Sequence, residues 1–168
     1  MVTRRTDPEA GRAALAAWAT DPASARRPVL APAVRHTLEL FAEEHPGGAV
    51  ELRVPPYAAV QAIAGTRHTR GTPPAVVETD AATWLALVTG DLTWDDVVAD
   101  GRVAASGERS DLSELLPLPG PRRTVRAARG TGAQPADGDA PGRHDAAPSR
   151  DPGAPSQDTD ASTAEETR

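Results

Sequence analysis

The sequence predicts one folded domain of the α+β class followed by a disordered tail, and three observations support this. Apolar residues recur at helical spacing in residues 31–45 and alternate with charged residues in residues 50–54. They become rare after Leu118. In residues 121–168 the only large aliphatic side chain is Val125, so this segment cannot bury enough apolar surface to offset its ordering entropy.

The same distribution divides the chain into three parts. We predict an N-terminal helical arm in residues 1–27, the folded domain in residues 28–120 and the tail in residues 121–168. The arm contains a helix from Pro8 to Ala19, because Asp7 is a good N-cap and proline suits the first helical position. A polar, proline-rich connection follows this helix, so we expect the arm to dock loosely.

The rest of the domain alternates between helical and extended signals. A helix from Ala31 to His45 ends at Pro46-Gly47-Gly48, where the apolar spacing stops. Two further helices begin at Asp80 and Thr93 and end near glycines, with Val97 and Val98 turned inward in the second. Ser110 is the predicted cap of a last helix, and prolines 117 and 119 end the fold. Period-two patterns, short β-branched runs and flanking turns predict strands in residues 50–54, 57–64, 75–79 and 102–106.

The composition excludes several kinds of chemistry. The chain has no cysteine, and all 18 of its basic residues are arginine. Thiol nucleophiles, cysteine-ligated metals, Schiff-base lysines and the phosphate-binding P-loop are therefore excluded. The four histidines lack metal-site spacing, and Ser106 is not in a GxSxG motif. We therefore expect no enzyme activity, no metal and no cofactor.

Charge and hydropathy also limit the partners. The net charge is −6, and the arginine-rich run of residues 122–129 has no aromatic residue for base stacking, so nucleic acid is not an expected partner. No apolar run is long enough to cross a bilayer. The first residues lack the apolar segment of a secretory signal, so we expect a cytoplasmic protein. The oligomeric state stays open.

Several short motifs between Pro28 and Leu118 resemble the sterol carrier protein family, in particular the short bacterial members that stand alone. They are Val54-Pro55-Pro56-Tyr57, His68-Thr69-Arg70-Gly71-Thr72-Pro73-Pro74, Val76-Val77-Glu78-Thr79-Asp80, Thr83-Trp84-Leu85 and Gly101-Arg102-Val103-Ala104-Ala105-Ser106-Gly107. One departure is Ala75, where close relatives have asparagine.

The resemblance implies a mixed, mostly antiparallel sheet covered by helices. It also implies an apolar cavity between sheet and helices that takes fatty acyl or sterol-like molecules, so non-catalytic binding or carriage of a lipid is the expected function. The same fold forms the C-terminal part of mycothiol-dependent maleylpyruvate isomerases. An accessory or protein-interaction module is therefore the alternative.

Two sets of residues are candidates for ligand binding. His68 and Arg70 can hold an anionic headgroup, or carry catalysis if a polar pocket surrounds them. The structural alternative, which the sequence favours, is that Arg70 pairs with a carboxylate such as Glu78 while His68 satisfies a backbone carbonyl in a rigid turn. The apolar candidates lie on helix faces, where packing of an ordinary core is the alternative. These candidates are Trp84, Leu87, Val88, Leu112, Leu115 and Leu116.

Overall fold

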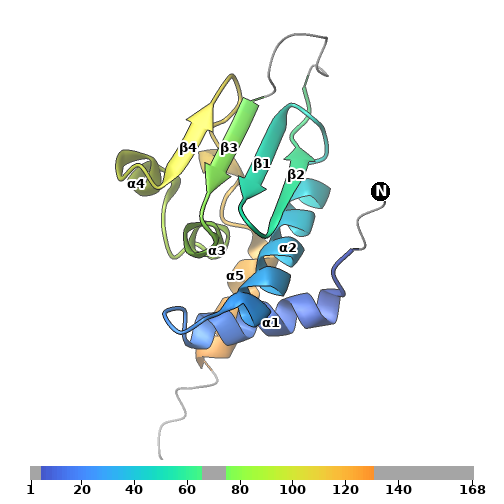
Figure 1. The fold of residues 1–168 in the computed structure, drawn as a ribbon, viewed down its shortest axis with the longest axis vertical. Coiled ribbons are helices and arrows are strands. Elements are labelled where there is room, and N and C mark those ends of the chain that lie inside the picture. The colour runs from blue at the N-terminus through green and yellow to red at the C-terminus, as the bar shows by residue number, and fades with distance from the viewer. Residues whose placement is uncertain (1–4, 66–74, 131–168) are drawn as a thin grey trace, which may run out of the picture. The chain divides into compact units, whose positions relative to one another are not determined.

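A computed structural model describes residues 5–65 and 75–130 of the chain. Helices and strands follow one another in the predicted order as far as residue 106 (Figure 1). The elements are α1 (Pro8–Thr20), α2 (Arg27–Glu44), β1 (Val50–Val54), β2 (Ala58–Ala62), β3 (Ala75–Thr79), α3 (Ala81–Thr89), α4 (Trp94–Ala99), β4 (Val103–Ser106), the 3₁₀ turn η1 (Ser113–Leu115) and α5 (Pro119–Gly130).

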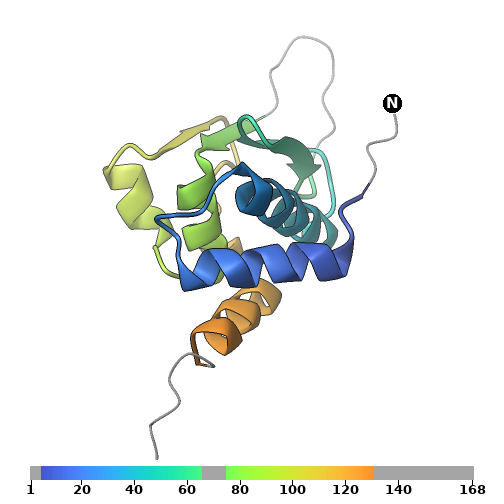
Figure 2. The ribbon, with the colours of Figure 1, turned by 60° about the horizontal axis from the view of Figure 1, so that its bottom comes forward.

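The four strands form one sheet in the order β2-β1-β3-β4. β1 pairs with β2 in antiparallel and with β3 in parallel orientation, and β4 runs antiparallel to β3. The prediction of an α+β fold with a mixed, mostly antiparallel sheet is therefore confirmed. Alternate residues of β1 and β3 are buried, because one face of the sheet packs on helices α2 and α3 (Figure 2).

Trp84 of α3 lies at the centre of the packed interior. Its side chain is 1% exposed, and its indole Nε1–H donates a hydrogen bond of 2.9 Å to Oγ1 of Thr37 on α2. Its ring meets that of Phe41 edge-on, with centroids 5.7 Å apart. This polar contact inside an apolar cluster fixes how α3 lies against α2, since an unpaired indole N–H would be costly there.

The N-terminal helix is docked more tightly than its polar connection predicts. Asp7 caps it as expected, accepting a hydrogen bond of 2.8 Å from the backbone N–H of Ala10. Leu15 and Trp18 are 1% and 2% exposed and belong to the main core. The expectation of a loosely docked arm is thus wrong for α1. A short apolar stripe is sufficient to dock this helix because it packs against two other helices, α2 and α5 (Figure 2).

Helix boundaries differ from the predicted ones at two places. Helix α2 begins at Arg27, before the predicted start, because Pro28 lies in the first turn, where its missing N–H is no loss. Val98 is 44% exposed rather than turned inward, while Val97 is fully buried. Successive residues of a helix lie roughly 100° apart around its axis, so Val98 is turned away from the face of α4 on which Val97 is buried.

The predicted last helix is reduced to the single 3₁₀ turn η1. The hydroxyl of Ser110 donates to the carbonyl of Gly107 instead of capping a helix, and the carboxylate of Asp111 accepts from the backbone N–H of Ser113. Pro117 explains the short turn, because the residue before a proline disfavours helical geometry.

The fold does not end at the prolines. Residues 121–130, assigned to the tail from the sequence, belong to α5, where Pro121 and Val125 are buried and Ala128 packs against the core. These residues have i, i+4, i+7 spacing, the apolar stripe of a surface helix. The rest of the predicted tail, residues 131–168, lies outside the described residues.

An ion pair joins α5 to the loop after α3. Both guanidinium NH groups of Arg129 lie 2.7 Å from the Asp91 carboxylate, and Arg129 Nε donates to the carbonyl of Ala19. The hydrogen bonds from Arg129 hold the pKa of Asp91 below its ordinary value, against the opposing effect of burial.

We expect Asp91→Asn to lower the free energy of unfolding by about 0.5–1 kcal/mol at neutral pH, as for a well-formed surface ion pair. A carboxylate with a depressed pKa stabilises the fold fully above its unfolded pKa of about 3.9, and this contribution is lost as pH falls through the folded value. Urea unfolding at several pH values should show the difference from wild type shrinking below about pH 4. A difference that stays constant there would contradict this assignment.

Candidate functional site

The structure separates the predicted ligand-binding residues into three groups. His68 and Arg70 lie outside the described residues; Glu78, the suggested partner of Arg70, lies 4.0 Å from the guanidinium of Arg53. Trp84, Val88 and Leu112 are buried in the core, and Leu115 is half-buried against it. Leu87 and Leu116 are brought together at a groove.

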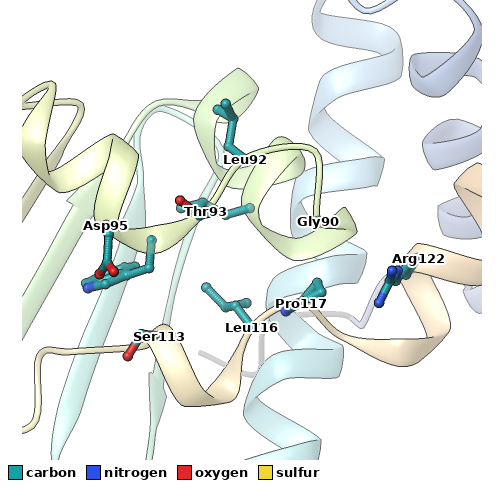
Figure 3. A pocket seen from close by; sticks show the side chains of 10 residues that line it. Gly90, Leu92, Thr93, Asp95, Ser113, Leu116, Pro117 and Arg122 are labelled. Atoms are coloured by element: carbon teal, nitrogen blue, oxygen red, sulfur yellow. The ribbon is translucent and has the colours of Figure 1, made fainter.

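This groove, which we call the α3–α4 groove, has a volume of about 370 Å³ (Figure 3). It lies where the end of α3, the start of α4, η1 and the start of α5 meet. Its lining is apolar in the middle and polar at the edges. The lining residues are Leu87, Gly90, Leu92, Thr93, Trp94, Asp95, Ser113, Leu116, Pro117 and Arg122.

The connection between α3 and α4 forms one wall of the groove, and local sequence signals determine its conformation. Gly90 adopts the left-handed conformation, with φ of 85°, and ends α3. The chain then reverses, and Thr93 caps α4 by accepting a hydrogen bond from the backbone N–H of Asp96. This tight connection places Leu92 and Trp94 at the groove.

The opposite wall comes from the segment after η1. Its Leu116 and Pro117 side chains lie beneath the reversal of α3 into α4 (Figure 3). The backbone N–H of Leu118 donates a hydrogen bond of 3.0 Å to the carbonyl of Val88, which fastens this segment to the end of α3. The groove therefore depends on a contact between segments distant in sequence.

The two ends of the groove carry different polar groups. Asp95 and Ser113 lie at one end, and Arg122 lies beyond Pro117 at the other (Figure 3). The Arg122 guanidinium makes no ion pair with any residue that the structure describes. An apolar floor with a free cation at one end can receive an amphipathic molecule that carries a negative charge.

The described residues show little that resembles a catalytic centre. The lowered carboxyl pKa values belong to helix caps, turns and ion pairs; at Asp80, for example, burial raises the pKa but hydrogen bonds from Thr83 and Ala82 outweigh it. Within residues 5–65 and 75–130, no three histidine or acidic side chains gather in a way that could hold a metal ion. In the same residues, no helix is long and apolar enough to cross a membrane.

Sequence reasoning missed several groove residues, including Leu92, Trp94, Pro117 and Arg122. A signal was present for the first two, because apolar residues that flank a glycine stop and a threonine cap lie in a connection that must fold back on its helix. No comparable signal marks Pro117 and Arg122, which reach the groove only through the placement of the segment after η1 and of α5.

A family model described as a bacterial SCP ortholog matches residues 26–118 of the chain. The search of curated proteins found no match to the chain. The matched segment contains the whole sheet and helices α2, α3 and α4, and it includes most of the α3–α4 groove. Helices α1 and α5 lie outside the match.

Proposed function

Since the chain belongs to the family of bacterial SCP orthologues, which are sterol carrier protein-like, we propose that it binds and carries a lipid or other apolar small molecule without reacting with it. The α3–α4 groove is the structural observation that supports this proposal in addition to the family match. Its volume of about 370 Å³ falls within the range of small-molecule sites.

The groove suggests how such a molecule would lie. An acyl chain or ring would cover Leu92, Trp94 and Leu116, since burial of apolar surface contributes roughly 25 cal/mol per Å². A carboxylate or phosphate on the same molecule would meet Arg122, which makes no ion pair with a described residue. In this proposal the protein supplies an apolar surface and a charge, and no proton transfer or nucleophile is involved.

Leu116→Asp should weaken binding of a medium-chain fatty acid by about 10- to 100-fold, because it removes apolar contact worth about 1.5–3 kcal/mol and places a like charge beside the ligand. Trp94 lies in the groove, so its fluorescence reports binding. Leu115→Asp is the matched control, since Leu115 is also half-buried but does not line the groove. Its affinity should stay within about threefold of wild type.

Circular dichroism should first show that both variants are folded. Native mass spectrometry of the purified full chain would then identify any lipid that co-purifies. Equal affinities for the two variants would exclude the groove. No binding of any lipid by the wild-type protein would overturn the carrier proposal and favour an accessory module instead.

A further inference from the structure

A second cavity lies where α1, α2 and α5 meet, and we call it the terminal-helix pocket. Its volume is about 300 Å³. Arg12 and Leu15 of α1, His36 and Leu40 of α2, and the first turns of α5, including Arg123, line it. Two of its three helices, α1 and α5, lie outside the segment that matches the family.

His36 is the polar side chain buried at this pocket. It is only 5% exposed, yet its ring makes no hydrogen bond with another described residue. Helix α1 lies directly against the His36 side chain. If Gly11 carried a Cβ atom, that atom would lie 2.8 Å from Cδ2 of His36 and still closer to Cβ and Cγ of His36, so only glycine fits at this position. Among the described residues, the buried side-chain polar atoms without a partner are Trp18 Nε1 and His45 Nε2, so the ring nitrogens of His36 are open to the pocket and can hydrogen-bond a molecule that enters it.

The charges around His36 are predominantly positive. Arg12 and Arg123 both line the pocket, and neither makes an ion pair within the described residues. Glu39 is the acid that acts on His36, and its carboxylate already accepts hydrogen bonds from the N–H and hydroxyl of Thr6. The pKa of His36 is lowered, chiefly by burial and next by the charge of Arg12. The negative charge of Glu39 acts in the opposite direction and raises it.

The first turn of α5 contributes Gly120 and Pro121 to the lining. Pro119 and Pro121 have no backbone N–H, and that of Arg122 donates to the carbonyl of Leu118, so in this turn Gly120 alone can offer an N–H to a ligand. Leu15 and Leu40 supply an apolar wall. The pocket thus combines two arginines and a buried imidazole that can donate a hydrogen bond with space for a short apolar group.

We propose that the terminal-helix pocket binds a small organic anion, either a carboxylic acid or a phosphate ester, with a short apolar body. The anionic oxygens would contact Arg12 and Arg123 and accept a hydrogen bond from His36, while the apolar body would lie on Leu15 and Leu40. A volume of about 300 Å³ is at the lower end for ligand pockets, which suits a ligand with a short apolar body. This site is separate from the α3–α4 groove and does not depend on the proposed carrier function.

The test is isothermal titration of the full chain with hexanoate and hexyl phosphate, with hexanol and hexyltrimethylammonium as tail-matched neutral and cationic probes. At least one anion should bind, with both control probes at least about tenfold weaker, as expected when charged hydrogen bonds hold the ligand. Preference for hexanoate or for hexyl phosphate identifies the natural ligand as a carboxylic acid or a phosphate ester. Equal binding of hexanol, or no binding of either anion, would overturn the proposal.

Single substitutions locate the bound anion. Arg12→Gln and Arg123→Gln should each weaken binding by about tenfold, whereas Arg126→Gln, an exposed change of the same charge on α5, should have an effect below about twofold. All three arginines are exposed, so folding should survive and is checked by thermal melting. Leu116→Asp should leave anion binding unchanged. If it abolishes hexanoate binding instead, the acid occupies the α3–α4 groove, and this inference fails while the carrier proposal stands.

Discussion

Replacing Trp84 by alanine should lower the free energy of unfolding by about 3–5 kcal/mol, the usual range for deleting a buried large aromatic side chain. The indole is 1% exposed, and it contacts the Phe41 ring and the Thr37 hydroxyl on a different helix. Its removal leaves a cavity and an unused hydrogen-bond acceptor in the centre of the domain. Urea unfolding followed by circular dichroism measures the loss.

A second substitution separates the hydrogen bond from the packing. Thr37→Val keeps the shape of the side chain but leaves the indole N–H without its acceptor, which should cost about 1–3 kcal/mol. Val98→Ala, at an exposed position of α4, should change the free energy of unfolding by less than about 0.5 kcal/mol and serves as the control. A loss below about 1 kcal/mol for Trp84→Ala would mean that this residue borders open space, as the apolar cavity expected between sheet and helices requires.

The sequence predicted those elements whose ends are determined by one or two residues. Asp80 accepts hydrogen bonds from the N–H groups of Ala82 and Thr83, Gly90 takes the left-handed conformation, and Thr93 caps α4. Each of these signals acts within a few residues, so it can be recognised without knowing the rest of the fold. Alternation in β1 was equally informative, because only one face of the sheet is buried.

Helix α5 shows where local reasoning is insufficient. Its apolar stripe is only Pro121, Val125 and Ala128, and in an arginine-rich segment this does not predict burial. The helix packs because α1 presents Leu15 and Trp18 from the other end of the chain. Such pairing of distant, weakly apolar segments cannot be deduced from the composition of either one.

The same reasoning applies to the candidate sites. Of the apolar residues proposed from the sequence, Leu87 and Leu116 line the α3–α4 groove, whereas Trp84, Val88 and Leu112 are buried in the core. Helical spacing shows that a residue faces inward but not whether it meets another side chain or a cavity. His36 escaped notice for a related reason, since its burial depends on α1 crossing it at Gly11.

Val125→Asp should release α5 from the domain and lower the free energy of unfolding by about 1.5–3 kcal/mol, the contribution of one fully buried valine. Val125 is 3% exposed, so an aspartate there would lose its hydration without gaining a partner. Because α5 is joined to the domain at one end, it can swing away. The loss is therefore limited to the free energy of docking, and the sheet should remain folded.

Limited trypsin digestion distinguishes release of α5 from general unfolding. In wild type the helical backbone should protect the bonds after Arg122, Arg123 and Arg126, because a protease needs an extended chain. Val125→Asp should expose these bonds while circular dichroism shows the remaining fold intact. Arg126→Asp introduces the same acid at the neighbouring exposed position; it removes the trypsin site after residue 126 but should leave the bonds after Arg122 and Arg123 as protected as in wild type. Equal cleavage of wild type and Val125→Asp would show that α5 is not docked, and the terminal-helix pocket would then lose one of its walls.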